Sequence, residues 1–453
     1  MKTAVVVGGG VAGILSALLL KREYKQVYLI EKQNQLGGLL NSVQNEYGLW
    51  FDYGTHFLRE TGNSDLDGIL LKNVSEKNCY ILNYLKTGNY FQSKLNDQSP
   101  FPDLRLLPEP VYHQSIFDLL MANGEGKENL FGSLGEQLQA CYGKTVTEHF
   151  YRPVLKRFYG FDLSELSVNA HHLFGLTRFL AFDVHTTNEL KKSSIFDQKI
   201  AAHHYSERQS GLRNFYPKQS GIGDWVKLLN QQLAEEKITV LTNQTIQKIH
   251  VQNDSVQTVF VDRHAIDCDF LVWTLPLPLF LKTASIENYP IPKLPPRLKT
   301  RIYNFVFDKP FLTDLYYICC YDPGFLTYRI TLYSNIPFSS QRKYYHLTVE
   351  SLLKEGETGA PSAEVVRELI RMGVVSAGSS PLSHTESVVS EGFPVLLNSF
   401  VADSKRLLET MQKKFKNSIF LGKGVGVNFF MNDVLIDVYQ TLVGKKESVV
   451  LNY

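Results

Sequence analysis

The sequence predicts an α/β fold in which a domain built on a parallel sheet is interleaved with an α+β domain that contains an antiparallel sheet. Three observations lead to this prediction. The first 31 residues read as strand, glycine-rich turn, helix and strand. Residues 206–285 and 396–453 return to strands and helices of the same kind, whereas the segments between them are helical (61–205) or rich in strands (286–395).

The amino-terminal segment is predicted to form a βαβ unit. Thr3–Val7 is rich in valine, as expected of a buried parallel strand, and an apolar helix is predicted from about Val11 to Tyr24. A second strand, Gln26–Ile30, follows and leads into Glu31. Between the first strand and the helix lie three glycines with the spacing of a dinucleotide-binding turn: Gly8, Gly10 and Gly13.

Each part of this turn has a role in binding a dinucleotide. Gly8 lets the backbone turn, Gly10 lets it approach a pyrophosphate, and Gly13 lets the helix pack on the strand. The helix N-terminus offers free N–H groups and a partial positive charge. Glu31 is expected to accept hydrogen bonds from the adenosine ribose. The predicted cofactor contacts of this Rossmann-like unit are Gly8, Gly10, Val11, Ala12, Gly13, Glu31 and Lys32.

A secretory signal is the alternative interpretation of this segment, with Lys2 as the charged end and Ala4–Leu20 as the apolar core. Three consecutive glycines in mid-segment, the absence of a small-residue cleavage pattern and the charged residues that follow Leu20 argue against it. A membrane span is also disfavoured, because seventeen residues interrupted by glycines are fewer than the roughly 20 that a bilayer requires.

Composition limits the class of protein and its partners. The chain has 453 residues, 44% of them hydrophobic, and a net charge of +2, so it is expected to be globular and not to bind nucleic acid. Its five cysteines form no CxxC pair, which favours a reducing compartment and a cytoplasmic location. The adjacent pairs His171-His172 and His203-His204 lack the spacing of a zinc helix, so no metal is predicted.

The middle of the chain contains further elements near the expected cofactor. A glycine pair, Gly37-Gly38, lies beyond the second strand, and Leu49–Thr55 leads to His56. The parallel-sheet pattern returns with an amphipathic helix over Ile222–Glu236. Further strands are predicted at Ile238–Leu241, Ile246–Val251, Thr258–Val261, Phe270–Trp273 and Ser418–Leu421, and further helices at Leu134–Tyr142, Thr145–Phe158, Ala363–Met372 and Asn432–Leu442.

These patterns predict the domain boundaries. The dinucleotide-binding domain is assembled from residues 1–60, 206–285 and 396–453. Residues 61–205 are a helical insertion on the substrate side. Residues 286–395 form the substrate domain with its antiparallel sheet, because Arg301–Val349 alternates strand-like runs with turn signals such as Asp322-Pro323-Gly324.

Several motifs resemble those of a flavoprotein superfamily. GGGVAG, IEKQNQLGGL and FDYGTHFLRETG in the first 62 residues resemble the start of amine oxidases, protoporphyrinogen oxidase, phytoene desaturases and UDP-galactopyranose mutase. YPKQSGIGDW, TIQKI and CDFLVWTLPLP are similar to later flavin-domain segments of the same superfamily. The resemblance implies FAD as the cofactor. It adds the following cofactor contacts: Gly37, Gly38, Gly54, Thr55, His56, Ile246, Gly422, Asn432, Asp433 and Val434.

The substrate side resembles UDP-galactopyranose mutase most. Tyr53–Glu60 is similar to a mutase segment beside the flavin, which implies a catalytic role for His56, with a histidine that caps a turn as the alternative. Thr327–Tyr333 resembles the strand that carries a substrate-binding arginine, so Arg329 is the candidate for binding an anionic group and for catalysis; a solvated strand edge is the alternative. Arg59 and Lys423 are the other predicted substrate contacts.

Departures from the mutase pattern fall on the substrate side. Lys423 stands where the mutase has an arginine, Val427 and Phe429 stand where it has tyrosines, and Arg59 replaces a histidine. A lysine binds a diphosphate as a point charge, whereas an arginine forks onto it with two hydrogen bonds. The resemblance therefore implies a relative that keeps the flavin site and has a changed substrate site.

The function predicted first is that of an FAD-dependent oxidoreductase acting on a small, anionic sugar or nucleotide-sugar substrate, in surface-polysaccharide synthesis, with NAD(P)H as a possible external reductant. A mutase-like isomerase that uses reduced FAD is the alternative. A flavin-binding protein without catalysis is the second alternative.

Overall fold

The computed structural model describes residues 2–124, 131–207, 211–262, 264–336, 342–425 and 430–444. Val427 and Phe429, two of the mutase departures, lie outside these ranges. The strands are β1 (Thr3–Val7), β2 (Gln26–Ile30), β3 (Ser42–Gln44), β4 (Trp50–Asp52), β5 (Leu58–Arg59), β6 (Cys79–Leu82), β7 (Thr87–Phe91), β8 (Lys94–Asn96), β9 (Asn214–Pro217), β10 (Thr239–Leu241), β11 (Ile246–Gln252), β12 (Ser255–Val261), β13 (His264–Asp267), β14 (Phe270–Trp273), β15 (Leu298–Phe307), β16 (Tyr317–Cys320), β17 (Thr327–Leu332), β18 (Tyr345–Leu353), β19 (Ser383–Phe393) and β20 (Ser418–Phe420). The main helices are α1 (Val11–Leu20), α2 (Ser64–Leu70), α3 (Glu109–Met121), α4 (Leu134–Tyr142), α5 (Lys144–Val146), α6 (Arg152–Tyr159), α7 (Val184–Leu190), α8 (Ser194–Asp197), α9 (Gly223–Glu235), α10 (Leu277–Thr283), α11 (Ser362–Arg371), α12 (Asn398–Lys414) and α13 (Met431–Val443).

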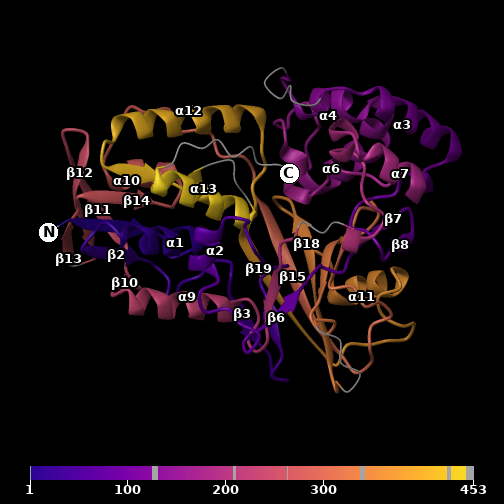
Figure 1. The fold of residues 1–453 in the computed structure, drawn as a ribbon, viewed down its shortest axis with the longest axis horizontal. Coiled ribbons are helices and arrows are strands. Elements are labelled where there is room, and N and C mark those ends of the chain that lie inside the picture. Colours follow the sequence, from indigo (N-terminus) through magenta and orange to yellow (C-terminus); the bar gives the residue numbers. More distant parts are fainter. Residues whose placement is uncertain are drawn as a thin grey trace.

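A five-stranded parallel sheet forms the first part of the molecule (Figure 1). Its strand order is β10-β2-β1-β14-β20, so segments from the beginning, middle and end of the chain lie side by side. The sheet thus has the α/β, Rossmann-like character that the sequence predicts. Both of its faces are covered, which explains why β1 is apolar at every position after Thr3.

Alternate residues of β1 enter two different hydrophobic cores. Ala4 and Val6 pack in a core with α1, α9 and α13. Val5 and Val7 pack on the other face, in a core with α10, α12 and the three-stranded antiparallel sheet β11-β12-β13. Since side chains alternate across a strand, one short valine-rich segment holds the two layers together.

Helix α1 is shorter than the sequence predicts. It ends at Leu20 rather than near Tyr24, and residues 21–24 form a turn in which the Tyr24 N–H donates to the Leu20 carbonyl at 2.9 Å. The turn redirects the chain so that Gln26 can begin β2, parallel to β1. The tertiary requirement for a parallel partner therefore overrides the local helical pattern.

A seven-stranded sheet with the order β19-β15-β18-β17-β16-β7-β8 forms the second part. All its neighbouring strands are antiparallel except β7 and β16, which are parallel. Strands β7 and β8 come from the segment that the sequence predicts to be a helical insertion. The fold is accordingly the mixed α/β architecture with antiparallel sheets that was predicted, but one edge of the sheet is built from 87–96.

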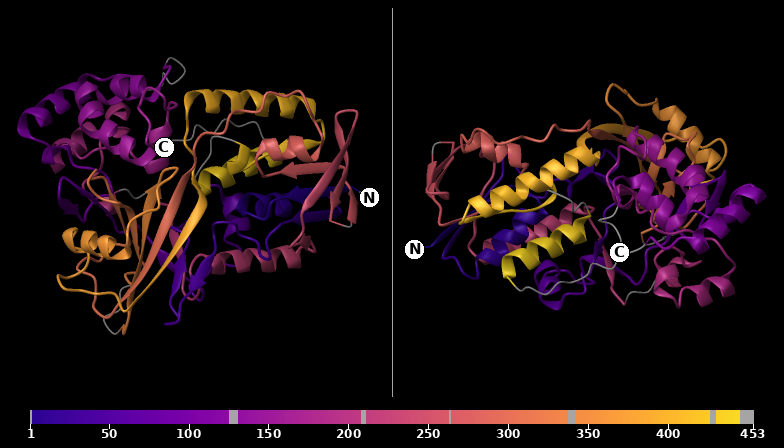
Figure 2. Two further views of the ribbon diagram at one scale, coloured as in Figure 1. Left: turned by 180° about the vertical axis from the view of Figure 1, so that it is seen from behind. Right: turned by 90° about the horizontal axis from the view of Figure 1, so that it is seen from above.

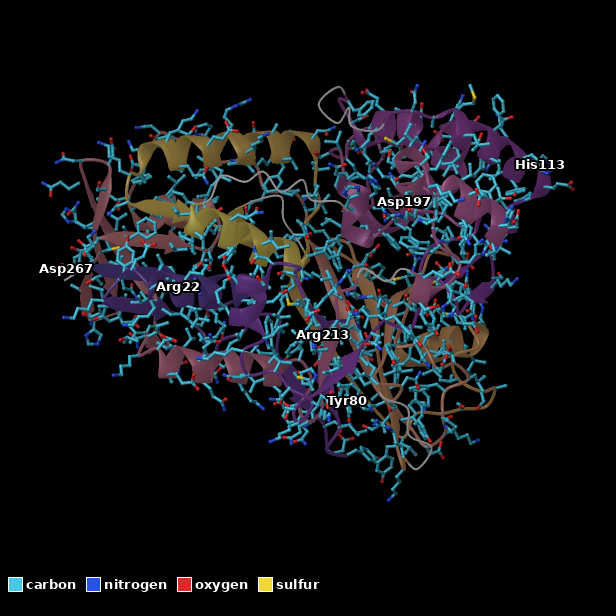
Figure 3. The ribbon with its side chains drawn as sticks, in the orientation of Figure 1. Arg22, Tyr80, His113, Asp197, Arg213 and Asp267 are labelled. Carbon is cyan, nitrogen blue, oxygen red and sulfur yellow. The ribbon has the colours of Figure 1, made fainter. Side chains whose placement is uncertain are left out.

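Helices α3 to α8 lie together above the seven-stranded sheet, and both views in Figure 2 place them on the side of the molecule away from the N-terminus. Their core includes side chains of β16, β17 and β19. Figure 3 shows His113 of α3 and Asp267 of β13 at opposite ends of the long axis. Tyr80 and Arg213, near the middle, mark the small sheet β5-β9-β6 between the two parts. Within the described ranges, no helix has the length and apolar character needed to cross a bilayer.

Candidate functional site

The carboxyl ends of the parallel strands carry the glycines that the sequence predicts to bind a cofactor. Gly8 follows β1 with a φ of +104°, and a Cβ atom there would lie 2.2 Å from the Thr274 Oγ1 atom at the end of β14. A Cβ atom on Gly13 would lie 1.8 Å from the Gly8 carbonyl oxygen. Both positions therefore require glycine, for the turn and for the packing of α1 on β1 respectively.

Gly10 differs from these two glycines because a Cβ atom there would meet no described atom within 4 Å. Gly10 is the N-cap residue just before α1, and no described side chain caps this end of the helix. The second glycine pair lies beside it: the Gly37 N–H donates to the Gly9 carbonyl at 2.8 Å, and a Cβ atom on Gly38 would lie 3.7 Å from the Gly10 Cα atom. The structure thus leaves open the position where a phosphate would approach a helix N-terminus.

Glu31 lies at the end of β2 and is held in place by backbone donors. Its carboxylate accepts hydrogen bonds from the Gly9 N–H at 2.6 Å and the Gln33 N–H at 2.8 Å. The Gln244 N–H donates to its carbonyl at 3.0 Å, which brings the half-buried Ile246 at the start of β11 to the same end. Lys32 is exposed. A carboxylate can accept further hydrogen bonds, so Glu31 remains suited to a ribose.

A buried polar network holds the loop that carries Gly54, Thr55 and His56. The Asp52 carboxylate accepts hydrogen bonds from Ser42 Oγ at 2.6 Å, Tyr216 OH at 2.8 Å and the Ile222 N–H at 2.9 Å. Its backbone N–H donates to the Tyr333 hydroxyl. Burial raises the pKa of Asp52 to about 6. This network ties the loop to the segment YPKQSGIGDW and to the end of β17.

Arg329 of β17 forms an ion pair with Glu350 of β18. The Arg329 Nε atom lies 2.8 Å from Glu350 Oε1, and Nη2 lies 2.9 Å from Oε2. The Arg329 side chain is 19% exposed and that of Glu350 only 3%. The Glu350 charge raises the pKa of Arg329 against the opposing effect of burial. The guanidinium is therefore permanently charged and gives two of its donors to one carboxylate.

The loop at Gly54 packs on this ion pair. The Thr55 N–H donates to Glu350 Oε1 at 3.2 Å, and the hydroxyls of Thr55 and Thr331 are hydrogen-bonded to each other. A Cβ atom on Gly54 would lie 3.2 Å from Glu350 Oε2. The polar face of β17 is thus buried against the loop, and it is not the solvated strand edge that the sequence left open.

His56 has a half-buried side chain with an enclosed Nε2 atom, which has no hydrogen-bond partner among the described residues. Burial lowers the pKa of His56 to about 4, and the positive charges of Arg329 and Lys423 act in the same direction. The imidazole is therefore neutral near pH 7. A neutral, buried ring nitrogen without a partner is a feature that a bound ligand would explain.

The remaining predicted residues come from the end of the chain. Gly422 has a φ of +82° and a Cβ atom there would lie 3.2 Å from the Ala12 Cβ atom, so the turn after β20 adjoins the start of α1. Lys423 Nζ donates to the Gly392 carbonyl at 2.8 Å. Asn432 Nδ2 donates to the carbonyl of the exposed Arg59 at 3.3 Å. Burial raises the pKa of Asp433 to about 6.

The structure therefore divides the predicted residues into two neighbouring groups. The first group, at the edge of the parallel sheet, contains Val11, Ala12, Glu31 and six glycines: Gly8, Gly10, Gly13, Gly37, Gly38 and Gly422. The second group lies where the loop meets β17 and contains Gly54, Thr55, His56 and Arg329. Val434 belongs to the hydrophobic core with α1. Lys423 is related to both groups. Its positive charge lowers the pKa of His56, and the preceding Gly422 adjoins the start of α1.

Sequence reasoning missed Glu350, the residue that organises the second group. It stands in the strand Tyr345–Leu353, where it is 2% exposed. The available signal was a lone acidic residue inside the strand-like run HLTVESLL, which is mostly apolar or β-branched. Such a residue is buried only with a partner, and an arginine on a neighbouring strand could have been sought.

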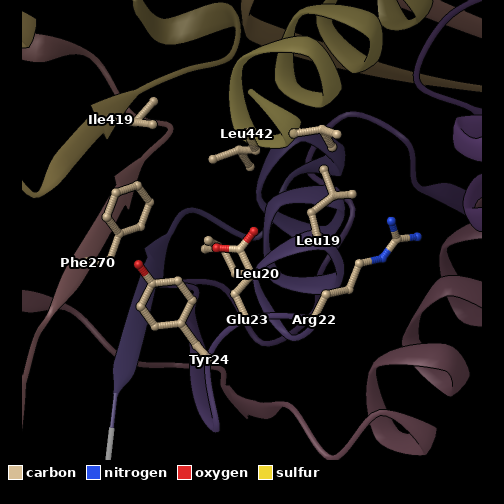
Figure 4. A pocket seen from close by; sticks show the side chains of 9 residues that line it. Leu19, Leu20, Arg22, Glu23, Tyr24, Phe270, Ile419 and Leu442 are labelled. Carbon is tan, nitrogen blue, oxygen red and sulfur yellow. The ribbon is translucent and has the colours of Figure 1, made fainter. Parts of the chain in front are cut away.

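A cavity of about 670 Å³ begins beside the first group, at Gly38 and Lys423; His56 and Arg329 are not among its lining residues. Gly38, Thr274, Lys423 and Asp433 line its cofactor side. A second, smaller pocket of about 220 Å³ lies among Leu19, Tyr24, Phe270 and Leu442 (Figure 4). It is at the C-terminal end of α1 and the amino-terminal end of β14, opposite the edge where parallel sheets bind ligands.

Comparisons with known sequences match parts of the chain. Residues 6–69 match the family model described as an NAD(P)-binding Rossmann-like domain. An uncharacterized protein from the nifH2 3′ region of Methanothermococcus thermolithotrophicus is 38% identical over 87 residues, which cover 19% of this chain and 79% of that protein. All-trans-retinol 13,14-reductase of Rattus norvegicus is 32% identical over 73 residues, which cover 16% of this chain and 12% of the reductase.

Solved structures match the whole chain at low identity. Reduced UDP-galactopyranose mutase superimposes with a TM-score of 0.71 at 14% identity, covering 99% of this chain and 95% of the mutase. A putative protoporphyrinogen oxidase from Exiguobacterium sp. 255-15 gives 0.66 at 16% identity, with 98% of each chain covered. A CLA-producing fatty acid isomerase from P. acnes gives 0.61 at 13% identity, again with 98% of each chain covered. The resemblance seen in the motifs is thereby confirmed for the fold.

Proposed function

Because the chain is a relative of the methanogen protein and has the fold of the superfamily that includes UDP-galactopyranose mutase and protoporphyrinogen oxidase, we propose that it is an FAD-dependent oxidoreductase. The observation that carries the proposal is the opening at Gly10. It lies between an uncapped helix N-terminus, the Gly37-Gly38 loop and Glu31, which is the arrangement that a dinucleotide requires.

The residues present fit FAD. The α1 N-terminus and Gly10 would bind the pyrophosphate, Glu31 the ribose, and the turn at Gly422 would lie along the cofactor. His56, with its unpartnered Nε2 atom, would face the flavin end. When bound, the flavin supplies the transfer of a hydride or electron pair.

The protein's own groups can orient the reactants and accept a proton. In the tautomer with its proton on Nδ1, a neutral His56 presents the unpartnered Nε2 as an acceptor for a hydrogen bond or a proton from a ligand hydroxyl or N–H group. Arg329 keeps a fixed positive charge behind the loop, which disfavours a second positive charge on His56. Burial of the ring is the larger cause of its neutrality, and the Glu350 charge acts in the opposite direction, so His56 is an acceptor near pH 7 because burial and Arg329 outweigh Glu350.

A sugar or nucleotide-sugar substrate, and with it a role in surface-polysaccharide synthesis, stays a prediction from the sequence. It relies on Arg329 as the anion-binding group, and that guanidinium already donates to both oxygens of Glu350. A mutase-like isomerase is the second candidate, favoured by the superposition on reduced UDP-galactopyranose mutase over nearly the whole chain. NAD(P)H as the external reductant is part of the proposal.

A cavity-filling variant tests cofactor binding without disturbing the fold. Gly10→Leu places its side chain in space that no described atom occupies within 4 Å of the Cβ position, so the protein is expected to fold and to lose FAD. Gly68→Leu is the matched control, because Gly68 in α2 is also open but lies in another element. Flavin absorbance after reconstitution and the circular-dichroism melting curve are the two readouts. Equal FAD affinity of Gly10→Leu and wild type would refute the proposed site.

The redox balance of the reaction separates the two candidates. Loss of flavin absorbance at 450 nm under anaerobic conditions on adding substrate would identify the oxidoreductase. Turnover only after dithionite reduction, with substrate and product of equal mass, would identify the isomerase instead.

A further inference from the structure

The large cavity extends well beyond the residues expected to bind FAD. Its cofactor side is formed by loop residues at the ends of parallel strands, whereas the far side is formed by α12, the segment 292–297, the end of β19 and residues 167–173. Backbone contacts join these far walls: the Ser167 N–H donates to the Leu396 carbonyl at 2.8 Å, and Leu166 and Leu397 form an isolated bridge. The cavity therefore reaches from the candidate cofactor site to the helical part.

The two sides of the cavity differ in chemistry. Lys423 and Asp433 stand on the cofactor side. The far side is lined chiefly by hydrocarbon side chains, among them Leu173, Leu294, Phe393, Val395, Phe400 and Leu408. Polar residues are interspersed among them: Ser167, Asn169, His172 and Ser404. Asn169 already accepts a hydrogen bond from Gln137 at 2.6 Å. A wall in which hydrocarbon predominates suits the apolar part of a ligand.

Exposed hydrophobic residues mark the rim of the same cavity. Leu294 is 54% exposed, Phe430 40% and Leu39 36%, and all three line the cavity. Two exposed basic residues, Arg297 and Lys405, also line it. An apolar rim beside positive charges is complementary to a molecule that has a hydrocarbon chain and an acidic end.

We propose that this cavity binds an elongated apolar substrate with one acidic end, its chain along α12 and its acidic group near Arg297 and Lys405. The role of this ligand as a substrate rests on the proposed flavin-dependent function; its binding to the cavity does not. The proposal replaces the expected sugar nucleotide by a long-chain carboxylic acid or a similar amphiphile as the substrate class.

Binding of cis-parinaric acid to the FAD-containing protein tests the proposal, because the fluorescence of this polyene acid rises when it leaves water. We expect saturable binding at one site. Leu294→Glu should weaken it about tenfold or more, since a charge placed on the apolar wall must be desolvated. Ile291→Glu is the matched control: Ile291 is 56% exposed in the same segment but does not line the cavity, so binding should be unchanged.

A second pair of variants tests the acidic end. Lys405→Gln should weaken binding of the acid about three- to tenfold, and it should not affect binding of the corresponding alcohol. Arg406→Gln, at the next position of α12 and outside the cavity lining, should leave both affinities unchanged.

Three results would overturn the proposal: no saturable binding to folded, FAD-containing protein; competition between FAD and parinaric acid for one site; or equal loss in Leu294→Glu and Ile291→Glu. Displacement of the probe by UDP-galactose at micromolar concentration would restore the sugar nucleotide. If the protein binds the probe but never FAD, the cavity assignment stands and the proposed flavin function fails. The two failures are thus distinguishable.

Discussion

Removal of Glu350 should destabilise the protein strongly, because it leaves the Arg329 charge buried without its partner. The two side chains form two hydrogen bonds of 2.8 and 2.9 Å at 19% and 3% exposure. For unit charges about 4 Å apart at an effective dielectric constant of about 20, the attraction is about 4 kcal/mol. Loss of one partner of a buried pair typically costs about 3–5 kcal/mol, so Glu350→Gln should lower the free energy of unfolding by that amount.

Urea unfolding of a double-mutant cycle measures this interaction. Arg329→Met, Glu350→Gln and the double variant should be compared, and the double variant should lose about 2–3 kcal/mol less than the sum of the single losses. Glutamine keeps an oxygen that can accept the Thr55 N–H, so the cycle reports on the charge pair rather than on the loop.

An exposed pair provides the control. Lys72 and Glu235 lie 3.1 Å apart at 43% and 54% exposure, so the same cycle there should give a coupling below about 1 kcal/mol. If the coupling between Arg329 and Glu350 is as small as in this control, the pair does not organise the site as argued here.

Three further predictions concern single residues. Burial holds the pKa of His56 near 4, below its unfolded value. Its contribution of up to about 3 kcal/mol to the free energy of unfolding should therefore be present above pH 6.5 and be lost as pH falls toward 4. His56→Asn should flatten this part of the stability curve, measured by urea unfolding at several pH values, and an unchanged slope would contradict the assignment. Burial raises the pKa of Asp52 to about 6, so the pH dependence that it contributes has the opposite sign. The free energy of unfolding should decrease by up to about 3 kcal/mol as pH rises from 4 to 6. Asp52→Asn should remove this decrease relative to wild type. Gly13→Ala should lower the melting temperature, since its Cβ atom would lie 1.8 Å from the Gly8 carbonyl oxygen and overpacking of this kind costs about 1–3 kcal/mol. Gly68→Ala, in open space, is the control and should raise the melting temperature. An unchanged melting temperature in Gly13→Ala would show that α1 does not pack on the turn as described.

Local sequence patterns were sufficient for several elements in both parts of the molecule. β14 and α4 have the bounds that the sequence predicts, and α9 and β11 differ from them by a residue at most. These elements succeed because the apolar period of a helix or a buried strand depends on neighbours in sequence. The glycine turn belongs to the same class, since Gly8 and Gly13 are required by contacts within one βαβ unit.

Elements that depend on distant partners were not predictable. β7 and β8 join the seven-stranded sheet through β16, more than 220 residues later in the chain, and the β7 sequence TGNYF has no distinct period. The predicted end of α1, near Tyr24, was wrong for a related reason: residues 21–24 must turn the chain toward β2. In both cases a tertiary contact overrides a weak local preference.

By itself, the sequence determined the βαβ unit at the amino end and the residue types that a dinucleotide needs there, because those requirements are met within about 30 consecutive residues. Only the tertiary structure decided what surrounds the reactive end of the site. It placed Arg329 against Glu350 and enclosed the Nε2 atom of His56. It also lined the cavity beside Gly38 and Lys423 with hydrocarbon from α12 and β19. Charge pairing and burial depend on which strands become neighbours, and no spacing along the chain contains that information.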